Sequence, residues 1–262
     1  MVTIAKNIGG YAHYVVDSQN VGDTINFAAR QSVYMSFTVV EFEASMQERF
    51  RELCALPSIY QMNIHFQTSR RGDAQSDAIL EMVNILVEVQ GLQILFLDFS
   101  AETTQIGNVG ASILSGLRRI RSPYLRSLKL DLSDNGINGN GAMAFAFVQP
   151  HLTTMSLNLN HNQITGDGAL SLVTALGHMF LHLELRELWL GLADNKMGAR
   201  SLRRVIDWKN CVRSNTLCRL FLNITGNPGL SASDISALNQ GYPLLHWDER
   251  EWDTERDAAF HG

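Results

Sequence analysis

Two histidines four residues apart are the first candidates for chemistry in this chain. His178 and His182 have the spacing that can place two metal ligands on one face of a helix. Their run reads HMFLH, without the glutamate of the H-E-x-x-H metal motif, and it falls where a helical pattern gives way to a strand pattern. No cysteine pair or acidic ligand follows at metal-ligand spacing. We therefore expect no metal site.

The glycines, serines and aspartates do not form a catalytic motif either. Gly107, Gly110 and the cluster between Gly136 and Gly141 lack the G-x-x-x-x-G-K-[ST] spacing of a phosphate-binding loop. A G-x-S-x-G nucleophile elbow is missing as well. Four aspartates recur at spacings that spread them over a surface and do not pair them: Asp131, Asp134, Asp167 and Asp194. We expect that the protein is not an enzyme and binds no cofactor.

Composition narrows the class of protein further. The chain has 262 residues, of which 45% are hydrophobic, enough for one elongated domain. A net charge of −5 argues against a nucleic-acid binder, which would carry a basic field. Apolar runs stay below the roughly 18 residues of a membrane span, so we expect none. The first residues, MVTIAKNIGGYAHYVV, lack the layout of a signal peptide.

The three cysteines indicate a reducing compartment. Cys54, Cys211 and Cys218 are an odd and sparse set, which does not make a disulfide framework. We expect an intracellular protein in which these thiols fill apolar space. Cys54 ends an apolar helical stripe and is expected to be buried, whereas Cys218 starts a strand and is expected to be partly exposed.

A repeated sequence pattern along the chain predicts the secondary-structure elements that would position a functional site. Leu or a stand-in repeats as L-x-x-L-x-L-x-L, and in four copies an Asn follows three residues after the fourth apolar position. The clearest copy is Leu125, Leu128, Leu130, Leu132 and Asn135. With degenerate copies included, the pattern starts at positions 32, 59, 92, 125, 152, 185 and 217, at intervals of 27 to 33 residues. A fixed period of this length is the signature of a solenoid.

Each copy predicts one strand followed by one helix. The alternating apolar residues have the period of a strand. The apolar residues after the turn have the period of an amphipathic helix, with Val109 and Met143 among the positions expected to face the core. One strand and one helix per repeat require a parallel sheet with helices on one side.

The repeat resembles the leucine-rich repeat family, specifically its ribonuclease-inhibitor-like class. That class carries L-x-x-L-x-L-x-x-N-x-L-x-x-x-G, and residues 127–141 read SLKLDLSDNGINGNG. The resemblance implies an α/β fold: a right-handed αβ solenoid, the leucine-rich repeat horseshoe, with parallel strands on the concave face and helices on the convex face. One extra pair of strand residues separates Leu125 from Asn135, and a shift of two leaves the face of each side chain unchanged. The first three copies replace the Asn with Phe42, Ser69 and Glu102.

The resemblance also implies a structural role for the recurring asparagines. In this family the Asn amide ties neighbouring turns together by bonding to backbone groups, and buried backbone groups need such partners. We therefore expect Asn135, Asn162, Asn195 and Asn227 to support the fold and not to contact a ligand.

The two ends of the chain are expected to protect the stack of repeats, because an uncapped terminal repeat exposes core. We predict an N-terminal cap at residues 1–31, a leucine-rich repeat solenoid of about seven repeats at residues 32–240, and a C-terminal cap and charged tail at residues 241–262. Trp247 and Trp252 lie in the last segment among charged residues. This segment either covers the last repeat or docks on a partner, and both interpretations stay open.

The strand residues between the leucines should form the concave face. Trp189 and Phe221 fall in the same column of adjacent strands, with Glu187 and Arg219 beside them. Exposed aromatics with charged neighbours have the make-up of an interaction hot spot. The alternative is that residues 242–252 fold over the pair. The residues predicted to bind a partner are Trp189, Phe221, Arg219, Glu187, Phe96 and Trp252.

Two functions from different classes follow. The first is a non-catalytic protein–protein interaction module, alone or as a subunit of a larger multi-subunit complex, which binds another protein through the concave face and the C-terminal region. The second is a regulator of a small GTPase, because the chain resembles Ran GTPase-activating proteins in its repeat class. The acidic tail of that family is far longer, and no motif here singles out that activity. A GTPase assay with and without the protein separates the two.

Overall fold

One sheet runs through the chain, with helices packed against it. The computed structural model describes residues 3–8, 11–16, 33–39, 44–56, 59–66, 73–100, 105–147, 149–179, 184–211, 217–229 and 231. The strands are β1 (Thr3–Ile8), β2 (Tyr11–Val16), β3 (Val33–Val39), β4 (Ile59–Phe66), β5 (Ile94–Asp98), β6 (Ser127–Asp131), β7 (Thr154–Asn158), β8 (Glu187–Gly191) and β9 (Arg219–Asn223). The helices are α2 (Ala44–Cys54), α3 (Asp73–Leu86), α4 (Gly107–Leu114), the 3-10 helix η1 (Ser115–Arg119), α5 (Gly139–Met143), α6 (Gly166–Met179) and α7 (Ala199–Cys211).

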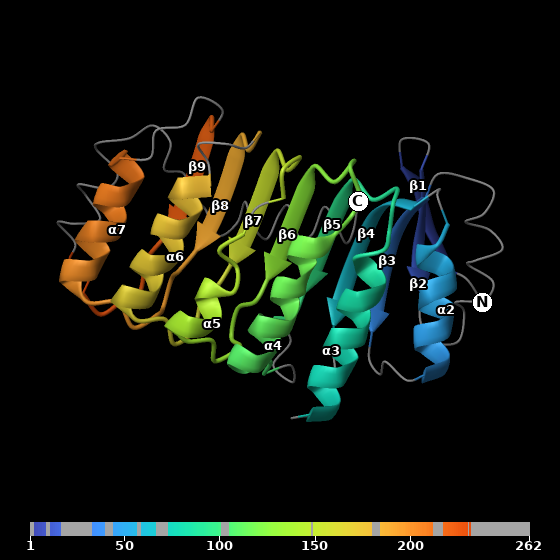
Figure 1. Ribbon diagram of the computed structural model, residues 1–262, viewed down its shortest axis with the longest axis horizontal. Coiled ribbons are helices and arrows are strands. Elements are labelled where there is room, and N and C mark those ends of the chain that lie inside the picture. Colours follow the sequence, from blue (N-terminus) through green and yellow to red (C-terminus); the bar gives the residue numbers. More distant parts are fainter. Residues whose placement is uncertain are drawn as a thin grey trace.

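The order of the strands in the sheet follows the order of the chain. β1 pairs with β2 antiparallel, and every later neighbour pair from β2 to β9 is parallel. Helices α2 to α7 alternate with strands β3 to β9, and they lie together on one side of the sheet (Figure 1). The predicted α/β solenoid of parallel strands and one-sided helices is confirmed.

The spacing of the two layers makes one face of the sheet concave. Neighbouring strands lie about 4.8 Å apart, whereas a helix with its side chains is about 10 Å across. Each repeat is therefore wider on the helix side, and the stack bends away from the helices. We call the helix-free side of the sheet the concave face.

The core lies between the sheet and the helices. Leu128, Leu130 and Leu132 are fully buried, and the strand register places Leu130 between Leu97 of β5 and Leu157 of β7. The same columns run through all described repeats as one continuous apolar cluster. The strand register that the Leu pattern predicts is confirmed.

Two helical positions predicted to face the core do not. Val109 is 64% exposed and Met143 is 37% exposed. In α4 the buried positions are Gly110, Ala111 and Leu114, so its apolar stripe is rotated away from Val109. Helix α5 ends at Met143 after five residues, so the chain leaves the helical path there.

The sheet extends beyond the predicted repeats at its N-terminal end. Strands β1 and β2 lie within residues 1–31, where we predicted a cap without assigning its secondary structure, and β2 pairs with β3. Their capping role stays a prediction. Residues 241–262, predicted as the C-terminal cap, lie outside the described residues. In the described part of the chain, no helix combines the length and the apolar character needed to cross a membrane.

Candidate functional site: the concave face of the sheet

Strand register arranges the concave side chains in three rows that cross β4 to β9. The outer row consists of Gln61, Ile94, Ser127, Thr154, Glu187 and Arg219. The central row consists of Asn63, Phe96, Lys129, Ser156, Trp189 and Phe221. The polar row, at the carboxyl ends of the strands, consists of His65, Asp98, Asp131, Asn158, Gly191 and Asn223.

The structure brings four of the predicted binding residues into contact. The rings of Trp189 and Phe221 stack with their centroids 3.6 Å apart and their planes at 14°. The indole Nε1 of Trp189 donates a hydrogen bond to Glu187. The other carboxylate oxygen of Glu187 lies 3.8 Å from Nη1 of Arg219. We call these four residues the aromatic cluster; it joins β8 to β9.

The expectation that the predicted aromatics are exposed is wrong for two of them. Trp189 is 7% exposed and Phe96 is 3% exposed, although both stand on the concave face. Phe96 lies on β5, separated from Trp189 in the central row by Lys129 and Ser156, so it does not extend the aromatic cluster. The most open part of the cluster is Arg219, whose side chain is 66% exposed. Trp252 lies outside the described residues.

The polar row contains a recurring turn motif that we did not single out in the sequence. Asp98, Asp131, Asn158 and Asn223 each accept a hydrogen bond at Oδ1 from the backbone N–H two residues further on, at 2.8, 3.1, 3.1 and 3.1 Å. The signal is an Asp or Asn followed two residues later by Ser, Asn or Thr. These side chains end their strands in a fixed geometry.

Gly191 interrupts the polar row to make room for its neighbour. A Cβ added at Gly191 would lie 2.7 Å from Oδ1 of Asn160. That oxygen instead accepts a hydrogen bond from the backbone N–H of Ala193 at 2.8 Å. The amide of Asn160 therefore replaces the turn contact that a side chain at position 191 makes in the other strands.

Two buried aspartates on neighbouring strands have opposite pKa shifts. Burial alone would raise the pKa of Asp98, but hydrogen bonds from His65 and Ser100, together with the charge of His65, outweigh it and hold the pKa below its ordinary value. Nδ1 of His65 donates to Oδ2 of Asp98 at 2.7 Å. Burial and the charge of Asp98 raise the pKa of Asp131. Folding therefore favours the charged form of Asp98 and disfavours the charged form of Asp131.

We expect Asn substitutions at these two positions to change stability in opposite directions. The hydrogen bonds to Asp131 from Ser133 and Asn158 all use Oδ1, which Asn retains, so Asp131→Asn should raise the free energy of unfolding at pH 7 by removing a disfavoured charge. That gain should shrink as the pH falls through the raised pKa of Asp131. Asp98→Asn should lower stability at pH 7, because the contribution of Asp98 is present above its ordinary pKa of 3.8 and is lost only below it.

Urea denaturation of the two variants and the wild type at several pH values between 3 and 7 measures both effects. Each variant serves as the matched control for the other, because the two changes are identical and lie at the same position of adjacent strands. Equal losses of stability in both variants at pH 7 would contradict the opposite pKa shifts.

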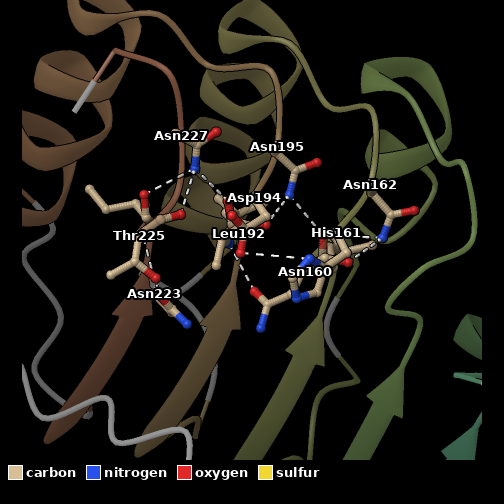
Figure 2. Close-up of polar contacts among 12 residues, drawn as sticks. Asn160, His161, Asn162, Leu192, Asp194, Asn195, Asn223, Thr225 and Asn227 are labelled. Atoms are coloured by element: carbon tan, nitrogen blue, oxygen red, sulfur yellow. Dashed lines mark hydrogen bonds and ion pairs between the residues drawn. The ribbon is translucent and has the colours of Figure 1, made fainter.

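The recurring asparagines link the turns that follow the strands (Figure 2). Nδ2 of Asn195 donates to the carbonyls of Leu159 and Ala193 at 2.9 and 3.0 Å, and its Oδ1 accepts from the N–H of Ile164 at 2.9 Å. The same contacts recur at the other three positions, each of which is at most 6% exposed: Asn135, Asn162 and Asn227. The predicted bonding of these amides to neighbouring turns is confirmed.

The turns also require unusual backbone geometry. The residue before each of these asparagines has a positive φ: 60° at Asp134, 55° at His161, 50° at Asp194 and 67° at Gly226. Asp, Asn and Gly tolerate this left-handed conformation best. Nδ1 of His161 also lies 3.6 Å from Oδ2 of Asp194, so these two exposed side chains meet between adjacent turns.

Among the described residues, the remaining candidates for chemistry, Cys54, Cys218 and His178, do not belong to the three rows of the concave face. Cys54 is buried, and burial raises the pKa of its thiol; Cys218 is exposed, as predicted for both. His178 is exposed on α6, and His182 lies outside the described residues. Among the residues that the structure describes, no three His, Cys, Asp or Glu side chains are grouped to hold a metal ion.

Comparison with known proteins identifies the repeat. The family model described as Leucine Rich repeat matches residues 124–146 and 150–173. These segments contain β6, α5, β7 and part of α6, and they support a leucine-rich repeat protein. No curated protein matches the chain. Leucine-rich repeats generally mediate protein–protein interaction, and domains built from them are typically non-catalytic.

Proposed function

We propose that this chain is a non-catalytic protein-binding module, or a subunit of a larger assembly, that binds its partner at the β8–β9 end of the concave face. The aromatic cluster supports this proposal. Stacked Trp189 and Phe221 offer a rigid apolar surface, and Glu187 fixes the orientation of the indole while facing Arg219. Trp and Arg are the residue types enriched in interface hot spots.

We further propose that the repeats are of the ribonuclease-inhibitor-like class. The support is their length and secondary structure. The pattern recurs every 27 to 33 residues, and a helix, not an extended segment, connects each pair of strands from β3 to β9. The long repeats of that class have the same composition of one strand and one helix.

The test of the proposed binding surface is the double variant Trp189→Ala with Phe221→Ala. We expect it to lose capture of the partner from a cell extract, because aromatic anchors can contribute roughly 2 kcal/mol or more each to an interface. Proteins retained by the wild type and lost by the variant are identified by mass spectrometry. The thermal melting of each sample shows whether the variant is still folded at the temperature of the capture.

Val109→Ala provides the matched control, since Val109 is an exposed apolar residue on the helix side of the sheet. It should capture the same proteins as the wild type. Capture unchanged in the double variant, or lost equally in the control, would contradict the proposed surface. If the captured partner is a small GTPase, an assay of its GTPase rate with and without this protein distinguishes simple binding from the regulatory alternative.

A further inference from the structure

An exposed basic loop lies at the edge of the sheet where the strands begin, outside the three rows of the concave face. Residues 118–126 read RRIRSPYLR and lead from η1 into β6. They contain four arginines and no acidic residue, in a chain whose net charge is −5. All four arginines are exposed, and Tyr124 is 56% exposed. We call residues 118–126 the basic loop; its arginines are Arg118, Arg119, Arg121 and Arg126.

Hydrogen bonds fix the backbone of the basic loop to the preceding repeat. The N–H of Arg121 donates to the carbonyl oxygen of Val87 at 3.2 Å. The next residue, Ser122, is buried, and its hydroxyl donates to the carbonyl oxygen of Leu92 at 2.6 Å. The loop therefore has a defined conformation before any partner binds, which lowers the entropic cost of binding.

The last arginine of the basic loop has a fixed side chain as well. Nη1 of Arg126 donates to the carbonyl oxygen of Pro123 at 2.9 Å and to that of His151 at 3.4 Å. The guanidinium thus connects the basic loop to the start of the next repeat. A guanidinium has five N–H donors in all. A carboxylate can accept two of them side by side, which makes arginine a suitable partner for acidic side chains.

Most of the positive charge of the basic loop is not neutralised within the described part of the chain. There, Glu88 is the only acidic side chain that forms an ion pair with one of these arginines, and its Oε2 lies 3.1 Å from Nη1 of Arg121. Both side chains are exposed, and exposed ion pairs contribute little to stability. The carboxylates of a partner can therefore bind beside Glu88 or displace it.

The opposite edge of the sheet, where the strands end, carries exposed acidic side chains. They belong to the turns after β6 and β8 and to the first turn of α6: Asp134, Asp194 and Asp167. Charges of opposite sign are thus separated between the two edges. A negatively charged partner is attracted to the basic loop and repelled by the other edge, so this charge distribution favours one orientation of the partner.

We propose that the basic loop is a second interaction surface, which binds an acidic segment of a partner protein that includes an apolar or aromatic side chain. The arginines match carboxylates in charge and geometry. Tyr124 offers an exposed ring for the apolar contact, and Tyr and Arg are both enriched in interface hot spots. A nucleic acid fits less well, because it requires an extended basic field, whereas these arginines occupy one loop of an acidic chain.

The basic loop is separate from the aromatic cluster, so this inference goes beyond the proposed function. The double variant Trp189→Ala with Phe221→Ala changes no residue of the basic loop. It should bind an acidic peptide as tightly as the wild type does, whether or not it captures a partner at the concave face. The two proposals can therefore fail independently of each other.

The experiment measures the binding of a fluorescein-labelled peptide of eight glutamates around one central phenylalanine, by fluorescence anisotropy at low ionic strength. We expect saturable binding to the 262-residue protein that weakens as salt is added, because salt screens exposed charges. Arg118→Gln with Arg121→Gln should raise the Kd at least about fivefold. Tyr124→Ala should also raise the Kd, because it removes the ring that contacts the phenylalanine. Thermal melting shows that each variant is folded.

The matched control is Arg200→Gln with Arg204→Gln, which removes the same charge from exposed positions of α7. It should change the Kd by less than about twofold, because these arginines lie three repeats away from the basic loop. Three results would overturn the inference: no binding of the peptide to the wild type, equal affinities of the two double arginine variants, or tighter binding of a labelled ten-nucleotide single-stranded RNA than of the peptide. A dimer of the wild type that the Arg118→Gln with Arg121→Gln variant does not form, measured by sedimentation, would assign the basic loop to self-association and overturn it too.

Discussion

Replacing Leu130 with alanine is expected to lower the free energy of unfolding by about 2–5 kcal/mol, the range for a buried Leu that leaves a cavity. Leu130 is fully buried in the middle of the sheet, between Leu97 and Leu157 in the neighbouring strands. A neighbouring side chain cannot move in to fill the cavity left by Leu130, because the backbones of the flanking strands β5 and β7 are held in place by their strand pairing. Urea denaturation followed by circular dichroism measures the loss.

Leu157→Ala should give a loss of the same size, since Leu157 occupies the same column and is also fully buried. Val109→Ala is the control, because Val109 is mostly exposed and its truncation should stay within about 0.5 kcal/mol. Losses below about 0.5 kcal/mol at both leucines would mean that the strand register is wrong.

Replacing Asn162 with alanine is the second change with a large expected effect. Nδ2 of Asn162 donates to the carbonyls of Leu132, Leu159 and Asn160 at 2.9, 3.1 and 3.0 Å. Its Oδ1 accepts from the N–H groups of Asn135 and Ile137 at 3.2 and 2.8 Å. Alanine leaves these backbone groups without their partner in a site that is 6% exposed, and the expected loss is on the order of 3 kcal/mol.

Thermal melting compares this variant with Asn140→Ala, which makes the same chemical change at an exposed position of helix α5. The control should melt at or slightly above the wild-type temperature, because alanine favours a helix more than asparagine does. If Asn162→Ala melted like the wild type but failed to capture the partner, Asn162 would belong to the binding surface and its structural assignment would be wrong.

The place of each residue within its repeat could be predicted from the sequence, because it depends on local periodicity. The period-2 pattern around Leu128 and Leu130 determined which strand residues face the helices, and the repeat length determined which residues of adjacent strands align. That was enough to place Trp189 beside Phe221, because one strand, one turn and one helix repeat at nearly constant length. The bonding of Asn162 to its neighbouring turns was implied by the resemblance to the leucine-rich repeat family and not by the periodicity.

The exposure of a side chain on a given face of the sheet or helix could be learned only from the tertiary structure. The strand pattern puts Phe96 and Trp189 on the concave face, but it carries no information about what packs over that face, so their low exposure was not predicted. The helical pattern likewise did not show that α4 is rotated away from Val109.

The electrostatics of the polar row also required the three-dimensional arrangement. His65 and Asp98 are 33 residues apart in the chain, as are Asp98 and Asp131, yet the parallel register makes each pair neighbours across one strand spacing. The direction in which the pKa of each aspartate shifts then depends on which neighbour is a histidine and which is another carboxylate. Periodicity determines the face of a residue, whereas its exposure and pKa depend on the groups that folding brings to that face from distant parts of the chain.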